Sequence, residues 1–340
     1  MMPTPLQTVL SVKDLFISIP LDEGLLTPVR GVDFDLREKE TLGLVGESGC
    51  GKSLTVKSIL GINEAKCQTQ GSIHFTDAKG NAKDLVKLKP NGKEIRAIRG
   101  NAISMIFQEP MSAFSPLFTV GQQLSECMRL HTNESKDAIH AHIIETMRKV
   151  GIADPEKRFK QYPHEFSGGM LQRALITMAL LCKPRVLIAD EPTTALDVTI
   201  QAQILDLLKE LQHSFGMAIL YITHDLGTVA QICDRVSVMY LGRVIETGSV
   251  HAIFENPAHP YTRGLINSVH KIGTKSTRLF SIEGSVPLAM NLSPRCGFYD
   301  RCTHRQAQCL NSAEPTLTQV DDQHFAACYH PFRGSLRQEA

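Results

Sequence analysis

The sequence predicts an α/β fold organised around a glycine-rich loop between a strand and a helix. Residues 46–53 match the pattern G-x-x-x-x-G-K-[ST] at every fixed position. A short apolar stretch, 41–45, precedes this loop, and 53–60 can continue as a helix, which is the order of strand, loop and helix that the pattern requires. Further apolar stretches end on polar residues, as parallel strands do at the sheet edge that binds ligands.

The predicted phosphate loop consists of Gly46, Glu47, Ser48, Gly49, Cys50, Gly51, Lys52 and Ser53. Its glycines allow a tight turn, so that successive N–H groups can point at phosphate oxygens beside a helix N-terminus. Lys52 would reach the β- and γ-phosphates, and the Ser53 hydroxyl would ligate Mg²⁺. The alternative, an ordinary glycine-rich turn, is disfavoured by the flanking elements and by the Gly-Lys-Ser ending.

Composition narrows the class of protein. Among 340 residues, 36 Lys and Arg nearly balance 35 Asp and Glu, which gives no support to a nucleic-acid-binding surface. No apolar run approaches the ~18 residues of a membrane-spanning helix, and no signal peptide is evident. We therefore expect a cytosolic protein that contacts a membrane only through a partner. Nine cysteines without an export signal favour free thiols or metal ligands over disulfides.

Upstream of the loop, residues 8–40 alternate short apolar stretches with a turn-rich piece, which predicts an antiparallel sheet. Residues 71–75 predict another strand, and the polar, Lys-rich stretch 77–93 predicts a solvated segment. Phe16 is a candidate to stack on adenine, and a core position in a strand explains it equally well.

Two segments are predicted to be helical. In the stretch 121–151, the apolar residues that fall on one helical face are Ile139, Ile143, Met147 and Val150. This segment carries no chemistry of its own, so we interpret it as an insert in a catalytic core. Ser167, Gly168 and Gly169 open a second, Ala- and Leu-rich helix, where an anion can bind. Taken alone, a simple N-cap with a flexible entry explains these residues as well.

Three predicted buried strands end on side chains suited to nucleotide chemistry. Gln108 follows one strand, Asp190 and Glu191 follow another, and His224 follows a third. Asp190 can hold Mg²⁺ through water, Glu191 can polarise an attacking water, and Gln108 can orient a water or touch Mg²⁺. Each group is also compatible with a polar strand end or, for His224, a structural role. The phosphate loop upstream favours the functional interpretation.

In this order the segments resemble the ATP-binding subunit of an ABC transporter, over residues 8 to about 248. That family has a RecA-like phosphate-loop ATPase core with an antiparallel β subdomain and a helical insert. Beyond the phosphate loop, the resemblance rests on Gln108, on the signature Ser167-Gly168-Gly169-Met170-Leu171-Gln172-Arg173, on Asp190-Glu191, on Thr194-Ala195-Leu196-Asp197 and on His224. It implies ATP and Mg²⁺ as ligands, with Ser53, Gln108 and Asp190 around the Mg²⁺.

The chain also resembles the oligopeptide and dipeptide importer branch of this family. The residues that carry this likeness are 109–116, 190–199, 259–262, 284–287 and the terminal cysteines. The resemblance implies import of peptides, with nickel or another small solute as the alternative. It also implies two transmembrane permease subunits, a second homologous ATPase in a heterodimer and, indirectly, an extracytoplasmic solute-binding protein. The chain would then lie peripherally at the cytoplasmic face of the inner membrane.

The same resemblance implies a division of the chain and of its roles. An ABC ATPase domain would span 1–250, with its helical subdomain at 111–166, and a C-terminal extension would span 251–340. Two such domains act head to tail, so that the signature of one, here with Gln172 and the nearby Asp197 loop, covers the nucleotide of the other.

Catalytic roles follow for three side chains. Glu191 would be the general base or would orient the attacking water, and His224 would contact the γ-phosphate. Gln108 would sense Mg²⁺ and pass motion to the helical insert, which would receive a coupling helix of a membrane subunit.

Two positions depart from the pattern of the family. Phe166 stands where leucine is usual, a change that concerns packing more than ATP contact. In the family an aromatic residue usually stacks on adenine, and its usual positions fall near Ile19 or Val29 in this chain. We therefore expect an aliphatic contact with the base or a ring from a partner.

Four cysteines lie in the last part of the chain: Cys296, Cys302, Cys309 and Cys328. The intervening gaps of five, six and eighteen residues are too wide for common zinc knuckles and differ from ferredoxin patterns. Composition leaves zinc, an iron–sulfur cluster and no metal open. The importer resemblance favours a 4Fe-4S cluster, with Zn²⁺ second, in a structural role.

Two other functions compete with the importer. A soluble ABC ATPase of translation or repair is disfavoured by the single ATPase domain, the near-neutral charge and the importer-like tail. A regulatory subunit that does not hydrolyse ATP is disfavoured by the presence of Glu191 and His224.

Overall fold

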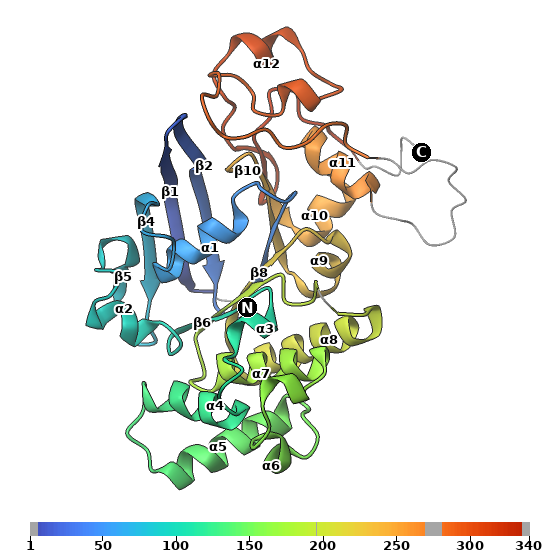
Figure 1. Ribbon diagram of the computed structural model, residues 1–340. Helices are drawn as coiled ribbons and strands as arrows, with labels where there is room; N and C mark the ends of the chain where they lie inside the picture. Colours follow the sequence, from blue (N-terminus) through green and yellow to red (C-terminus); the bar gives the residue numbers. More distant parts are fainter. Residues whose placement is uncertain (1–5, 195, 269–280, 335–340) are drawn as a thin grey trace.

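The computed structural model of the chain describes residues 6–194, 196–268 and 281–334. Ala195, predicted to belong to the loop that ends at Asp197, lies outside the described residues. The same holds for residues 1–5 of the predicted ATPase domain and for residues 269–280 and 335–340 of the predicted extension. Figure 1 shows the sheets in the middle, a group of helices in green at the bottom and the C-terminal extension in orange and red at the top.

The N-terminal segment forms the predicted antiparallel sheet, with strand order β2-β1-β4-β5. In β1 the alternate residues Leu15 and Ile17 are fully buried, which is the period-two pattern of a strand with one covered face. The strands of this sheet are β1 (Thr8–Leu21), β2 (Gly24–Arg37), β4 (Gln68–Thr76) and β5 (Ala82–Asp84).

A second sheet, ordered β11-β12-β10-β9-β3-β8-β7-β6, carries the site. β3 pairs in parallel with β8 and β9, and β7 pairs in parallel with β6 and β8, so the carboxyl ends of these strands meet at one edge. The strands of this sheet are β3 (Thr41–Val45), β6 (Ile103–Ile106), β7 (Val186–Asp190), β8 (Ala218–Thr223), β9 (Arg235–Tyr240), β10 (Arg243–Ser249), β11 (Thr318–Asp321) and β12 (His324–Ala326).

Both faces of the central strands are covered. Every residue of β3, β6, β7 and β8 is buried, and successive side chains enter two different hydrophobic clusters. The antiparallel sheet contributes to one cluster and the helical region to the other. Helical elements attached to the two sheets are α1 (Lys52–Leu60), η1 (Leu85–Lys87), α2 (Lys93–Ile98), α8 (Val198–Phe215), α9 (Leu226–Ile232) and α10 (Val250–Glu255).

The predicted helical insert contains short helices that pack on one another. Ile139, Ile143, Met147 and Val150 are all buried, which confirms the predicted apolar face. Thr119 forms a capping box with Gln122 at the start of the helix that begins at Val120. The helical elements are α3 (Pro110–Ala113), α4 (Val120–Arg129), α5 (Lys136–Lys149), α6 (Pro155–Arg158) and η2 (Pro163–Glu165). The helix α7 (Gly168–Leu180) follows the predicted insert and packs against α4 and α5.

The C-terminal segment packs against the central sheet. Its hairpin β11-β12 pairs with β10 and so prolongs that sheet. Behind β9, the rings of Tyr240, Tyr261 and Phe298 lie 4.7 to 5.5 Å apart, centroid to centroid. Buried Glu246 on β10 accepts hydrogen bonds from two N–H groups of the extension, at Ala258 (2.7 Å) and His259 (2.8 Å). The helical elements here are α11 (Pro260–Ser268), η3 (Tyr299–Arg301) and α12 (Ala307–Asn311).

Candidate functional site

The phosphate loop follows β3 and leads into α1, as the sequence predicts. Two glycines are required by close backbone contacts. A Cβ atom on Gly46, at φ 156°, would lie 2.2 Å from the carbonyl oxygen of Met239, and one on Gly51, at φ 101°, would lie 2.4 Å from that of Pro28. Neither position can accept a side chain without displacing a neighbouring strand.

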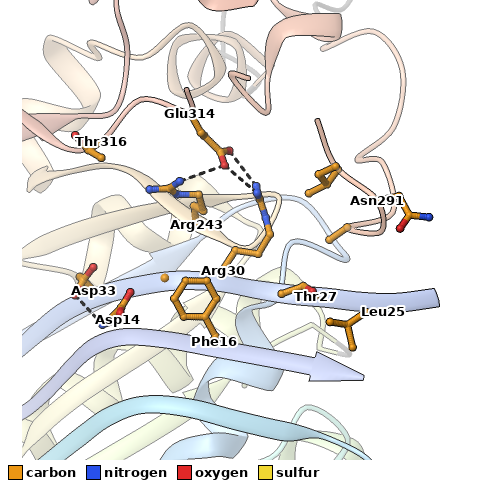
Figure 2. A pocket seen from close by; sticks show the side chains of 13 residues that line it. Asp14, Phe16, Leu25, Thr27, Arg30, Asp33, Arg243, Asn291, Glu314 and Thr316 are labelled. Carbon is orange, nitrogen blue, oxygen red and sulfur yellow. Dashed lines mark hydrogen bonds and ion pairs between the residues drawn. The ribbon is translucent and has the colours of Figure 1, made fainter. Parts of the chain in front are cut away.

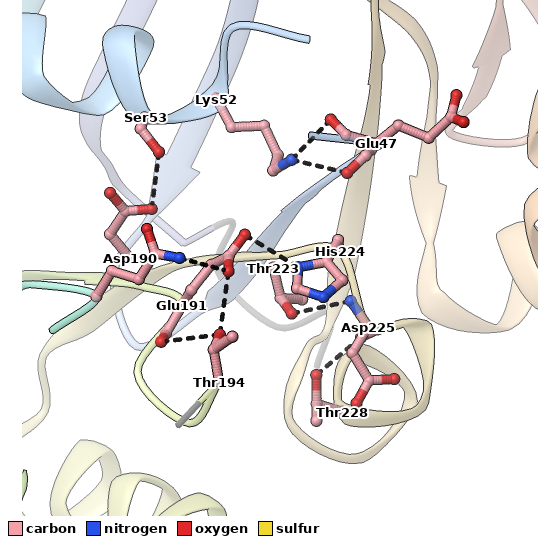
Figure 3. A network of polar contacts seen from close by, with 12 residues as sticks. Glu47, Lys52, Ser53, Asp190, Glu191, Thr194, Thr223, His224, Asp225 and Thr228 are labelled. Atoms are coloured by element: carbon pink, nitrogen blue, oxygen red, sulfur yellow. Dashed lines mark hydrogen bonds and ion pairs between the residues drawn. The ribbon is translucent and has the colours of Figure 1, made fainter. Parts of the chain in front are cut away.

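Lys52 and its neighbours are held by the loop itself. The Lys52 ammonium donates hydrogen bonds to the carbonyl oxygens of Gly46 (2.7 Å) and Glu47 (3.1 Å), as Figure 3 shows for the second contact. The side chain is 5% exposed, so the charge lies inside the curve of the loop. Ser48 and Gly49 are exposed at the tip, whereas Cys50 is buried. The arrangement provides a cation and a turn of backbone at a helix N-terminus, which suits an anion.

Ser53 and Asp190 meet next to the loop. The Ser53 hydroxyl donates to Asp190 Oδ1 over 3.2 Å, which joins the first helix to the end of β7 (Figure 3). Burial raises the pKa of Asp190, and the hydrogen bond from Ser53 opposes this shift. Hydroxyl and carboxylate oxygens are donors that Mg²⁺ accepts, so this pair fits the predicted cation.

The Glu191 carboxylate gathers the other predicted catalytic residues around it. It interacts with Gln108 Nε2 (3.1 Å), Thr194 Oγ1 (3.0 Å) and His224 Nδ1 (3.0 Å). Figure 3 shows Thr194 and His224 pointing at it from two different loops. Glu191 itself has a φ of 47°, a conformation that non-glycine residues rarely adopt. Glu191 therefore lies where side chains that follow β6, β7 and β8 come together.

The signature residues lie at an exposed helix start. Ser167 caps α7 and accepts a hydrogen bond from the Met170 N–H (3.4 Å), and Gly168 faces open space. Asp197 likewise caps α8, from an exposed position. Gln172 differs, because its side chain is only 1% exposed and faces the interior. Burial does not support the predicted contact of Gln172 with a nucleotide.

Phe16 is a partly exposed residue of β1 and not a core residue. It is 36% exposed on the face of β1 opposite Leu15 and Ile17. Figure 2 shows it beside Arg30 in a cavity, where Arg30 ion-pairs with Glu314. The volume of this cavity is about 560 Å³. No residue of the phosphate loop lines this cavity. The predicted core position of Phe16 is therefore wrong, and its stacking on adenine stays without support.

The terminal cysteines are free thiols that lie within electrostatic reach of one another. Burial raises the pKa of Cys296 to about 11 and that of Cys328 to about 12, and the thiols of Cys302 and Cys309 add to both shifts. In the part of the chain that the structure describes, no three Cys, His, Asp or Glu side chains are close enough to hold one metal ion. The positions of these cysteine side chains therefore do not support the predicted metal.

Sequence reasoning missed two residues that touch the phosphate loop. The Arg301 guanidinium pairs with the Glu47 carboxylate at 2.7 and 2.9 Å. The Tyr261 hydroxyl accepts a hydrogen bond from the Glu47 N–H over 2.9 Å. Both residues are more than 200 positions away in the chain, and no local pattern marks them.

Fold and site together define an ATP-binding protein of the ABC transporter class. Residues 29–194 match the family described as "ABC transporter", and residues 245–309 match the "Oligopeptide/dipeptide transporter, C-terminal region". The first match implies that the protein binds ATP, and the second covers part of the predicted C-terminal extension.

Relatives of nearly equal length narrow the assignment. The chain is 48% identical to the dipeptide transport ATP-binding protein DppD of Bacillus subtilis, over 95% of each chain. It is 43% identical to the oligopeptide transport ATP-binding protein OppD of Salmonella typhimurium, over 97% of this chain and 96% of that one. The chain belongs to the ABC transporter ATP-binding proteins of the oligopeptide/dipeptide transport family.

Solved structures confirm the predicted fold. The ATP-binding cassette MJ0796, in a dimeric post-hydrolysis state, superimposes with a TM-score of 0.62 at 22% identity and covers 71% of this chain and 98% of its own. The cbiO1 protein of Clostridium perfringens, part of a cbiONQ transporter complex, gives a TM-score of 0.58 at 28% identity, over 73% and 90%. The α/β ATPase cassette is thus confirmed. None of the described helices is long and apolar enough to cross a membrane.

Proposed function

We propose that this chain hydrolyses ATP to power the import of dipeptides or oligopeptides across the cytoplasmic membrane. The observation that carries the proposal is the likeness to DppD and OppD along almost the whole chain, including the C-terminal region of the family. Nickel or another small solute is the alternative cargo, because the residues that select cargo belong to other subunits.

The ATP site divides into binding and reacting groups. Lys52 and the loop N–H groups bind phosphate oxygens, and Ser53, Asp190 and Gln108 hold Mg²⁺, which neutralises phosphate charge when bound. Glu191 takes a proton from the attacking water or orients it. His224 bonds to Glu191, and in the proposed mechanism it would also contact the γ-phosphate.

A pair of ATPase subunits completes each site. Ser167, Gly168 and Asp197 stand at exposed helix starts that are suited to an anion brought by another subunit. The second subunit is a homologous ATPase rather than a copy of this chain, as the importer branch suggests. ATP held between the two favours the closed pair, and hydrolysis releases it.

Two permease subunits dock on the helical region at the cytoplasmic face of the membrane. Three large apolar side chains are exposed near the start of this region: Met111 (62%), Leu117 (78%) and Phe118 (53%). A cluster of this kind supports docking of an apolar helix face from a permease. Gln108 precedes these three residues in the chain, which agrees with the predicted role of Gln108 in passing motion from the ATP site to the helical insert.

The terminal cysteines bind a 4Fe-4S cluster, with Zn²⁺ as the second choice. Four buried or half-buried thiols that interact electrostatically with one another support this proposal, because cysteine thiolates are ligands of both groups. The cluster would fix the fold of the extension. Anaerobic purification followed by iron, sulfide and zinc analysis tests this assignment, and zinc without iron or sulfide would reverse the ranking.

Gentle extraction of membranes that contain the tagged chain, followed by mass spectrometry of what copurifies, tests the function. We expect two multi-spanning permeases and a second ATPase. Soluble partners alone, such as ribosomal or repair proteins, would refute the importer and favour the competing soluble ATPase.

A further inference from the structure

The C-terminal extension holds the first variable residue of the phosphate loop. Glu47 makes two contacts with the extension. Its carboxylate pairs with Arg301, and its backbone N–H donates a hydrogen bond to the Tyr261 hydroxyl. Both contacts come from beyond β10, and the Tyr261 ring is fully buried in the aromatic group that seats the extension on the sheet.

The ion pair between Arg301 and Glu47 has the geometry of a strong contact. Two parallel N–H donors meet two carboxylate oxygens, at 2.7 and 2.9 Å. The Arg301 side chain is 7% exposed and that of Glu47 is 30% exposed, so solvent screens the pair only in part. Arg301 also donates to the carbonyl oxygens of Glu283 (2.9 Å) and Gly284 (3.1 Å), which fix the guanidinium in place.

The pairing matters because Glu47 carries a negative charge inside a loop that binds phosphates. An unpaired carboxylate there would repel the triphosphate and compete for Lys52. Figure 3 shows the Glu47 side chain directed away from Lys52 and from the Ser53–Asp190 pair. Arg301 lies on that outer side, where it neutralises the carboxylate and holds it away from the nucleotide.

We propose that Arg301 is a positioning residue of the ATP site, through which the C-terminal extension sets the affinity of the phosphate loop for nucleotide. The inference rests on the proposed binding of ATP at this loop. Cys302 directly follows Arg301, so the fold around the cysteines decides whether Arg301 reaches Glu47. The extension then acts as part of the nucleotide site rather than as an appended module.

Calorimetric titration of the full-length chain with MgATP tests the proposal in a double-mutant cycle. Arg301→Gln should raise the Kd about tenfold, because it leaves Glu47 unpaired. In a chain that already carries Glu47→Gln, the same substitution should change the Kd by less than about twofold, since no carboxylate remains to be neutralised. Arg301→Lys should recover part of the affinity.

Arg295→Gln is the matched control, since Arg295 lies in the same segment but pairs with Asp300 (2.8 Å). We expect no change in its Kd. The inference would be overturned if Arg301→Gln weakened MgATP binding equally in chains with and without the Glu47 carboxylate, because Arg301 would then have only a structural role. A Kd for MgATP that Arg301→Gln leaves unchanged would overturn it as well.

A separate variant distinguishes this failure from failure of the proposed function. Lys52→Ala must weaken MgATP binding if the loop is the ATP site. A wild-type chain that binds no MgATP, or a Lys52→Ala chain that binds it equally well, would refute the ATP site itself and with it the role of Arg301.

Discussion

Replacement of Glu191 by glutamine tests whether this carboxylate acts on the attacking water. The side chain interacts with Gln108, Thr194 and His224 at 3.0 to 3.1 Å, so an isosteric amide fits the same space. What the substitution removes is the charge and the basic oxygen. General bases contribute about 10²- to 10⁴-fold to rate, and we expect the ATP turnover of the assembled transporter to fall by that factor. The Kd for MgATP should stay within about threefold, because Lys52 keeps its place and phosphate affinity is set mainly by such cations.

Phosphate release at saturating MgATP measures the turnover, and calorimetric titration measures the binding. Thr194→Val serves as the control, since it removes one hydrogen bond to Glu191 and leaves the base intact. Its turnover should fall by less than about tenfold, in line with the net worth of one hydrogen bond. Turnover of the Glu191→Gln transporter within a factor of about ten of wild type would refute the assignment.

Three further changes probe the loop and the extension. Lys52→Ala should raise the Kd for MgATP about 10- to 100-fold, the worth of one charge-assisted hydrogen bond, in calorimetric titration. Glu246→Leu leaves the N–H groups of Ala258 and His259 without their acceptor and should destabilise the extension by about 2 to 6 kcal/mol, measured by hydrogen exchange of β12, with a smaller loss for Glu246→Gln. Burial lowers the pKa of His259 from 6.5 to about 4, and its ring accepts a hydrogen bond from the Tyr261 N–H. Between about pH 4 and pH 6.5 the His259 side chain is therefore protonated in the unfolded chain and neutral in the folded chain. The free energy of unfolding should fall as the pH decreases through this range, by up to ~1.4 kcal/mol per pH unit. His259→Asn should make this dependence on pH weaker.

The core of the site could be predicted because its signals are local. The phosphate loop joins a strand and a helix that are adjacent in sequence, and Asp190 stands at the end of an apolar run. Parallel strands bring such ends to one edge whatever the loops between them contain. For this reason two of the neighbours of Glu191, His224 and Gln108, could be expected from their strand-end positions alone.

The contacts of the extension could not be predicted, because they join residues far apart in the chain. The ion pair of Arg301 with Glu47 spans 254 positions, and that of Arg30 with Glu314 spans 284. Neither arginine stands in a periodic pattern, so its partner depends on how the last segment packs against β9 and β10. The burial of Gln172 has the same origin, since its sequence neighbours are signature residues and only helix packing turns it inward. A motif therefore identifies candidate groups for binding ATP, whereas the residues that hold those groups in place follow from the tertiary structure.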